Sequence, residues 1–397
     1  MKRKGREGQT YRRSLYRGTA VLGLIDLLFL TAGFLLTIRF RDLSTGGIWA
    51  LKVAAIMVYQ LLFVLRSRQK ILSGKNLDHL WGLANLISLT RGLMIAILAG
   101  FLFAPKPAGI LGWLPAVLYS LLAILDFFDG YWARKSNTQT HLGELLDQEY
   151  DALGILVAVV LVIQWGHLPV PFLYIAVAKY VFAAGIAWRS FRGKAVYPLP
   201  PSYMRRRLAG FQMGILAVFL WPIARPPGTL LAELIIGVPL LLGFIRDWLL
   251  VSGALDPEDP GYRKIKKTFY NLGSRWLPPA IRAVLAVAAV QIGVRAFQQA
   301  TVSLTWIPET IPQGELLTLL HTAVRLLLLV VLVSGRFTSP AALAVLLLEG
   351  LRIFMSRLDP WGAVIVSAAL LLYLFGPGPF RLSFRRPART NSNAAGS

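Results

Sequence analysis

Apolar runs long enough to cross a membrane recur along the whole chain, and they limit the fold more than any other feature. A run of roughly 18 or more apolar residues spans a hydrocarbon core of about 30 Å. Hydrophobic residues make up 56% of the 397-residue sequence and charged residues only 15%, against about 25% charged in soluble proteins. The runs show no two-residue alternation, and an open sheet edge cannot face lipid, so helices are favoured over strands. The sequence therefore predicts an all-α polytopic membrane protein.

Twelve stretches qualify as candidate membrane helices. Several are short or interrupted by proline, so ten or eleven spans also fit the sequence. The first is interpreted as an uncleaved helix, because a cleaved signal peptide has a shorter apolar core and a small-residue cleavage site. The candidates are residues 18–38, 48–65, 83–104, 110–133, 143–165, 171–189, 208–223, 230–252, 277–298, 315–334, 340–355 and 361–376.

The charge distribution predicts how the chain is oriented. The formal net charge is +23, which in a soluble domain would suggest nucleic acid. In a membrane protein, basic residues instead collect in the cytoplasmic loops, so no nucleic-acid partner is expected. If the twelve spans alternate, both termini and most basic loop residues share one side, which we expect to be cytoplasmic. The absence of cysteine excludes disulfides, thiolate metal sites and a cysteine nucleophile.

Composition predicts four parts. Residues 1–75 carry two helices, residues 76–254 a core of six and residues 255–380 about four more, while residues 381–397 form a basic tail expected to be disordered. The third part opens with a polar linker that contains GYRKIKKTFYNLGSRW. This segment fits either a helix on an anionic lipid surface or an ordinary positively charged loop.

The stretch DFFDGYWARKSNTQTHLGELLDQEYD, residues 126–151, places six acidic residues between two apolar runs. Asp126 and Asp129 lie three apart near the end of one expected helix, and Asp147 and Asp151 lie four apart near the start of the next. Each pair shares a helix face, so two antiparallel helices can turn four carboxylates toward one point. Because unpaired carboxylates are costly at a membrane edge, a divalent cation is expected there. An oxygen-only ligand set favours Mg²⁺ or Mn²⁺.

Small residues accompany these acids. Gly130, Ala133 and Gly143 would leave a slot beside the metal, since glycine within a helix is tolerated where a ligand or backbone comes close. Arg134 adds a fixed positive charge suited to phosphate oxygens. A metal, a slot and an arginine together suit a pyrophosphate substrate.

The same residues resemble the signature of the CDP-alcohol phosphatidyltransferase family, D-x2-D-G-x2-A-R-x8-G-x3-D-x3-D, with every fixed position present. Upstream, ANLISLTR at residues 84–91 is similar to the family's P-N-x-x-T-x-x-R: Asn85 and Arg91 match, Ser88 replaces threonine and Ala84 replaces proline. PSYMRRRLAGFQ at residues 201–212 resembles the basic segment before the family's fifth helix, with Arg206 in place of the usual lysine. The resemblance covers only the central six helices.

The resemblance implies a phosphotransferase core that moves a phosphatidyl group from CDP-diacylglycerol to an alcohol and releases CMP. The charge distribution predicts that its acidic residues face the cytoplasm. It implies that Asp126, Asp129 and Asp147 hold the metal, that a second ion is shared with Asp151, and that Asp151 takes the acceptor's proton. Nucleotide contacts are expected from Asn85, Ser88, Gly130, Ala133, Arg134 and Gly143, and contacts to an acceptor phosphate from Arg205, Arg206 and Arg207. Another CDP-alcohol could be the donor, and glycerol 3-phosphate, an inositol phosphate, serine, a lipid or another polyol could be the acceptor.

A transporter or scaffold that uses the acids as an ion site is the alternative. Such a site is expected at mid-membrane, often between inverted repeats, whereas these acids lie at a helix end. The helices outside the core could form a homodimer or admit lipid. Among other charges, Glu144 and Glu149 are interpreted as ordinary acids of a helix N-terminus, and Lys179 could face the active-site cavity. Arg325 and Arg352 are expected to pair with Glu315 or Glu349.

Overall fold

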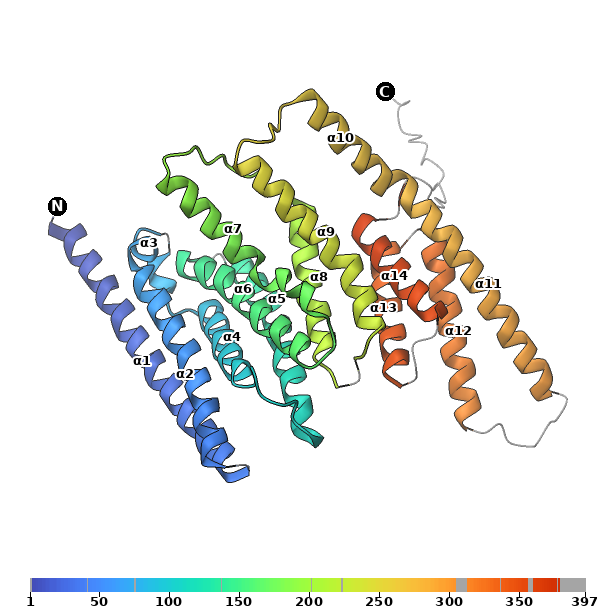
Figure 1. Ribbon diagram of the computed structural model, residues 1–397, viewed down its shortest axis with the longest axis horizontal. Helices are drawn as coiled ribbons and strands as arrows, with labels where there is room; N and C mark the ends of the chain where they lie inside the picture. Colours follow the sequence, from blue (N-terminus) through green and yellow to red (C-terminus); the bar gives the residue numbers. More distant parts are fainter. Residues whose placement is uncertain are drawn as a thin grey trace, which may run out of the picture. The chain divides into compact units, whose positions relative to one another are not determined.

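A computed structural model describes residues 2–40, 42–74, 76–136, 138–200, 202–222, 224–304, 313–335, 337–355, 360–376 and 378. Within these residues the chain is helical and has no strand (Figure 1). This confirms the all-α prediction, which rested on apolar runs without two-residue alternation.

Each candidate span coincides with a helix of the described chain. These are α1 (Lys2–Phe40), α2 (Leu43–Arg66), α4 (Leu83–Ala99), α5 (Leu114–Lys135), α6 (His141–Gln164), α7 (Leu173–Phe191), α8 (Tyr203–Phe219), α9 (Gly228–Val251), α11 (Leu277–Leu304), α12 (Gln313–Ser334), α13 (Thr338–Met355) and α14 (Pro360–Phe375). Shorter elements are α3 (Arg68–Leu72), α10 (Pro260–Asn271), the 3₁₀ turns η1 (Leu77–His79), η2 (Gly109–Trp113) and η3 (Val170–Phe172), and the π-helical turn η4 (Leu272–Trp276).

Six helical stretches of the described residues are long and apolar enough to cross a membrane, and five shorter apolar helices accompany them. The helix α6 is not among these eleven. Its 24 residues are enough to cross a membrane, but its first turns carry the acidic cluster. The chain is therefore an integral, multi-pass membrane protein.

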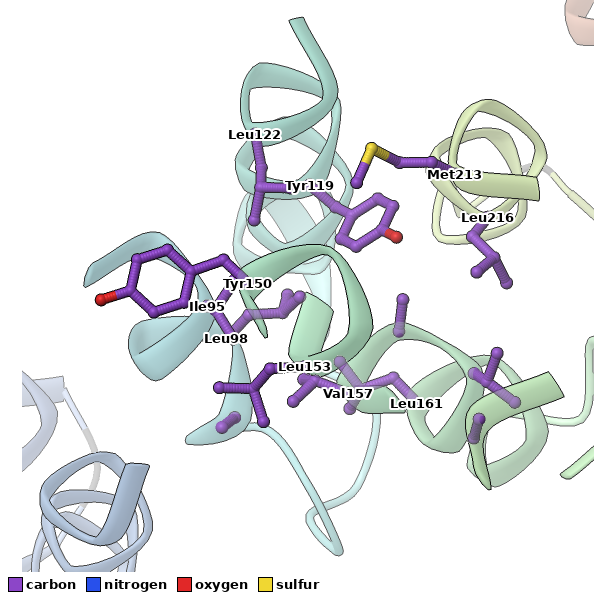
Figure 2. Close-up of a cluster of buried hydrophobic side chains, with 14 of the residues drawn as sticks. Ile95, Leu98, Tyr119, Leu122, Tyr150, Leu153, Val157, Leu161, Met213 and Leu216 are labelled. Carbon is purple, nitrogen blue, oxygen red and sulfur yellow. The ribbon is translucent and has the colours of Figure 1, made fainter. Parts of the chain in front are cut away.

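The chain divides into two compact units, Met1–Ser252 and Gly253–Ser397. In the first, α1 and α2 lie side by side as a hairpin, and α2 packs against α4 (Figure 1). The helices α4, α5, α6 and α8 enclose the core of this unit, where Ile95, Tyr119, Tyr150 and Leu216 are buried (Figure 2).

One glycine sets how closely α4 and α6 approach. A Cβ on Gly92 would lie 2.8 Å from ring atoms of Tyr150, closer than real side-chain contacts. The missing side chain thus lets the Tyr150 ring lie directly on the α4 backbone. The contact brings Arg91, the residue before Gly92, to the face of α6 that carries the acids.

The second unit contains α11 to α14 around buried residues such as Leu285, Leu329 and Ile365. Glu349 is fully buried there and accepts hydrogen bonds from Arg325 Nη2 at 3.3 Å and Arg352 Nε at 2.8 Å. Of the two partners expected for these arginines, Glu349 is therefore the one observed. The side chain of Glu315 lies outside the described residues.

Candidate active site

A capped turn brings the two acidic helices together. The helix α5 ends at Lys135, and Thr140 caps α6 by accepting a hydrogen bond from the Gly143 amide at 3.0 Å. Threonine is a favoured residue at this position because its hydroxyl satisfies an amide that has no partner inside the helix. The acids at the end of α5 therefore lie close to those in the first turns of α6.

Arg91 of α4 lies at the centre of the site. Its Nη2 is 2.6 Å from Asp126 Oδ1 and 2.5 Å from Asp151 Oδ1, and its Nη1 is 3.0 Å from Asp129 Oδ2 and 3.2 Å from Asp147 Oδ1. The Arg91 side chain is completely buried. All four signature aspartates thus converge, as their spacing predicted, and they share one guanidinium.

The donor set fits a divalent cation. Carboxylate oxygens of Asp126, Asp129 and Asp147 all lie within 4.8 Å of one another, a separation compatible with ligands of a single ion. One guanidinium leaves a cluster of four carboxylates with excess negative charge, which a second cation would offset. The side chain of Asp147 is 50% exposed and that of Asp151 39%, so the cluster is partly accessible.

Polar residues of α4 support the cluster from behind. Ser88 Oγ donates to Asp129 Oδ2 at 3.0 Å and to the Ala84 carbonyl at 3.2 Å. Both Ser88 and Asp129 are buried, so this hydrogen bond fixes the orientation of the carboxylate. Ser88 therefore touches a predicted metal ligand directly.

Asn85 joins the start of α4 to the start of α6. Its Nδ2 donates to Thr140 Oγ1 at 2.8 Å and to the Leu80 carbonyl at 2.9 Å. A Cβ on Gly143 would lie 2.6 Å from Asn85 Oδ1, so only glycine leaves room for this amide. Asn85 and Gly143 are thus close together, and Gly143 lies about one helical turn before Asp147 in α6.

A cleft of about 620 Å³ opens at the same end of α6. Its walls come from the loop after α3 and from the turn between α5 and α6. Thr140, which accepts the hydrogen bond from Asn85, also lines this cleft. Its lining residues are Ser73, Gly74, Asn76, Gln139, Thr140, His141 and Glu144.

The remaining predicted site residues do not all lie at the aspartate cluster, and some of their side chains are outside the described residues. Gly130 lies in α5 beside Asp129, whereas the side chains of Ala133, Arg134 and Arg206 lie outside the described residues. Arg205 Nη1 is 2.8 Å from Asp247 Oδ2 of α9, and Asp247 is also bound by its neighbour Arg246 at 2.5 Å. Arg207 is exposed at the start of α8.

Sequence reasoning gave Arg91 no role, although a signal was present. Asn85, Ser88 and Arg91 follow one another every three residues, which places them along one helix face. Ser88 and Arg91 were therefore predictable neighbours on the face turned toward the acids. What the spacing could not show was which acids that face would meet.

Glu149 also differs from its sequence interpretation, and Lys179 of α7 lies beside it. Glu149 Oε1 accepts hydrogen bonds from Tyr59 at 2.5 Å and Tyr180 at 3.4 Å, so it is not simply a solvated acid of a helix N-terminus. The Lys179 amino group lies on the Gln148 carbonyl and 3.8 Å from Glu149 Oε2. Lys179 thus supports α6 from the side of α7.

Comparison with known proteins identifies the region that holds this cluster. The family model for CDP-alcohol phosphatidyltransferase matches residues 81–245. Residues 81–245 form a CDP-alcohol phosphatidyltransferase domain. This phosphatidyltransferase domain contains the four aspartates and Arg91, whereas α1, α2 and the second unit lie outside it.

Curated relatives match between 27% and 36% of the chain. A CDP-diacylglycerol–glycerol-3-phosphate 3-phosphatidyltransferase of Salmonella choleraesuis is 27% identical over 147 residues, which cover 36% of this chain and 78% of that protein. Proteins with the same name from Wigglesworthia glossinidia brevipalpis and Cereibacter sphaeroides are 28% and 27% identical over 59% and 62% of their lengths. No solved structure matches the chain significantly. The chain is thus a membrane transferase of phospholipid biosynthesis, and it has helices on both sides of the matched residues 81–245.

Proposed function

We propose that the protein transfers the phosphatidyl group of CDP-diacylglycerol to the hydroxyl of glycerol 3-phosphate and releases CMP. The observation that carries this proposal is the convergence of Asp126, Asp129, Asp147 and Asp151 on one buried guanidinium inside the phosphatidyltransferase domain. The names of the relatives support glycerol 3-phosphate as the acceptor. The basic start of α8 supports an acceptor that carries a phosphate.

We assign the metal to Asp126, Asp129 and Asp147, with a second ion shared by Asp151. Mg²⁺ or Mn²⁺ suits their oxygen-only ligands. When bound, such an ion would offset the negative charge of the diphosphate. Ser88 and Arg91 orient these carboxylates through the contacts described above. The metal-binding residues therefore come from α5 and α6, and their support comes from α4.

Asp151 is the proposed base. Its carboxylate takes the proton of the acceptor hydroxyl while the acceptor oxygen forms a bond to the phosphorus of the phosphatidyl group. The bond from that phosphorus to the bridging oxygen of CMP breaks, and CMP leaves with the electron pair. Asp151 lies 2.5 Å from Arg91, which holds the carboxylate in place, and proton transfer is expected late, as the hydroxyl becomes acidic in the transition state.

We further propose that the nucleotide binds beside this cluster and that the acceptor phosphate meets the start of α8. Arg205 forms an ion pair with Asp247, so its guanidinium would exchange this partner for the phosphate when the acceptor binds. The proposed nucleotide residues are Asn85, Ser88, Gly130, Ala133, Arg134 and Gly143, and the proposed acceptor residues are Arg205, Arg206 and Arg207. The site and both termini face the cytoplasm in this proposal, and residues 76–254 form the catalytic core.

The test is the release of CMP by the purified full-length protein in lipid–detergent micelles. CDP-diacylglycerol is supplied with Mg²⁺ and, in separate reactions, glycerol 3-phosphate, inositol phosphate, serine or no acceptor. We expect turnover only with glycerol 3-phosphate and a product lipid of matching mass. Turnover with a different alcohol would show that glycerol 3-phosphate is the wrong acceptor, while the proposed class of reaction would stand. No turnover with any acceptor, together with cation flux into vesicles, would favour a transporter instead.

A further inference from the structure

The helix α10 and the turn η4 present an apolar stripe. Ile265, Phe269, Leu272 and Trp276 follow one another at intervals of four, three and four residues, which places them on one side of a continuous helix. Their exposed fractions lie between 53% and 70%. In the described part of the chain this stripe is therefore uncovered by protein.

The rest of the α10 surface is basic. Lys264, Lys266 and Lys267 are exposed and have no acidic partner among the described residues, whereas Arg263 pairs with Glu258. No acidic residue occurs between Pro260 and Trp276. An apolar stripe flanked by lysines is the pattern of helices that lie in a membrane interface.

The continuous helix that contains α10 is longer than the hydrocarbon core is thick. The continuous helix Pro260–Gln298 has 39 residues, about 58 Å at 1.5 Å per residue, nearly twice the roughly 30 Å of a bilayer core. The π-helical turn Leu272–Trp276 interrupts the regular hydrogen bonds where α10 meets α11. Trp276, next to this turn, is of the type enriched at membrane–water boundaries.

We propose that α10 binds the surface of the membrane through anionic phospholipids. Its apolar stripe enters the boundary between headgroups and acyl chains, and Lys264, Lys266 and Lys267 contact lipid phosphates. Because these lysines have no carboxylate partner within the described chain, their positive charge would select anionic lipid over zwitterionic lipid. This surface lies outside the phosphatidyltransferase domain and is independent of its chemistry.

Because the chain has no cysteine, single cysteines can report where α10 lies in the full-length protein. Phe269→Cys labels the apolar stripe, and Lys267→Cys, also exposed, is the matched control on the basic face. Each carries an environment-sensitive dye in vesicles of phosphatidylcholine alone or with phosphatidylserine. Spin-labelled lipids should quench the dye at position 269 in phosphatidylserine vesicles, but not at position 267.

The triple variant Lys264→Gln, Lys266→Gln, Lys267→Gln, carrying Phe269→Cys, tests the charge. Each basic residue near an anionic surface favours the bound state roughly fivefold, so the triple variant should lose most of the preference for phosphatidylserine. Equal quenching in both vesicles, or none in either, would overturn the proposal. A disulfide between two copies at position 269 would assign the stripe to a second chain instead, and would also overturn it.

A separate observation concerns α2, which lies outside the matched domain. Two consecutive residues of α2 contact both helices of the site. Gln60 is buried and donates to the Gly92 carbonyl of α4 at 2.9 Å, next to Arg91. The Tyr59 hydroxyl donates to Glu149 of α6 at 2.5 Å, between Asp147 and Asp151.

We infer that Tyr59 and Gln60 are positioning residues, which hold α4 and α6 at the separation that the aspartate cluster requires. This inference rests on the proposed metal-dependent function. This buried contact resists displacement, because the freed side-chain amide of Gln60 would find no water in the membrane. The N-terminal hairpin would thus be part of the catalytic machinery rather than an accessory anchor.

The test is the affinity of the full-length protein for Mn²⁺, measured by electron paramagnetic resonance without substrate. Tyr59→Phe and Gln60→Leu should each weaken binding by on the order of tenfold, while the thermal midpoint shows the variants to be folded. Val58→Leu, at an exposed position of the same helix, should bind as the wild type does. Wild-type affinity in both variants would overturn the inference, whereas no Mn²⁺ binding by the wild type would remove the metal proposal itself.

Discussion

Arg91 Nη2 lies 2.5 Å from Asp151 Oδ1, so a completely buried guanidinium holds the carboxylate proposed to take the acceptor's proton. The same nitrogen contacts Asp126 at 2.6 Å. A planar guanidinium can serve several carboxylates at once because its N–H groups point in fixed, separate directions. Arg91 thus offsets part of the negative charge of the four aspartates before any cation or substrate arrives.

Replacing Arg91 should destabilise the fold and end catalysis. Arg91→Met leaves four carboxylates without their shared partner, and breaking a buried ion pair costs about 3–5 kcal/mol. Arg91→Lys keeps the charge, but one amino group cannot bind Asp126 and Asp151 as well as Asp129 and Asp147. This variant should therefore lose less of its thermal stability than of its rate of CMP release. Thermal melts and CMP release check both variants. Mg²⁺ should raise the melting temperature of Arg91→Met more than that of the wild type, and a methionine variant as stable as the wild type would contradict the role.

Asp151→Asn should abolish turnover and preserve the fold. Loss of a general base lowers the rate by roughly 10²–10⁴-fold, while asparagine keeps the size of the side chain. CMP release and retention of a radiolabelled CDP-lipid are the two measurements. Glu258→Gln, at an exposed acid outside the phosphatidyltransferase domain, is the control and should turn over normally. Near-normal rates for Asp151→Asn would remove this residue as the base.

Removing divalent cations should stop the reaction reversibly. Asp126, Asp129 and Asp147 supply only oxygen ligands, so Mg²⁺ or Mn²⁺ should restore the activity lost in EDTA. A second measurement uses Asp129→Asn, which removes one carboxylate. This variant should need a higher metal concentration for its half-maximal rate. Full activity in EDTA would contradict a metal site here.

Gly143→Ala should disturb the site without touching an acid. The added methyl group would lie 2.6 Å from Asn85 Oδ1, so the Asn85–Thr140 contact must break or α6 must move. We expect a clear fall in CMP release. The comparison is Gly214→Ala, where a Cβ meets nothing within 4 Å and alanine should stabilise the helix by up to about 1 kcal/mol. Equal activity in both variants would show that the close approach at Gly143 is dispensable.

Local patterns in the sequence were sufficient for the helices and for the four aspartates. Apolar runs predicted every candidate span, since a segment in lipid must satisfy its own backbone hydrogen bonds. The three- and four-residue spacings of Asp126, Asp129, Asp147 and Asp151 fixed which side chains share a helix face. These are properties of one helix or of two helices joined by a short turn, so they can be read without knowing the rest of the fold.

The partners of those residues were decided by the tertiary structure. The spacing along α4 showed that Ser88 and Arg91 share a face, but not that Arg91 would meet all four acids. That meeting depends on the Gly92–Tyr150 contact, and the role of Glu149 depends on Tyr59, 90 residues away. Contacts over such separations depend on how helices pack, and packing is set by the shapes of all their side chains together rather than by any local period.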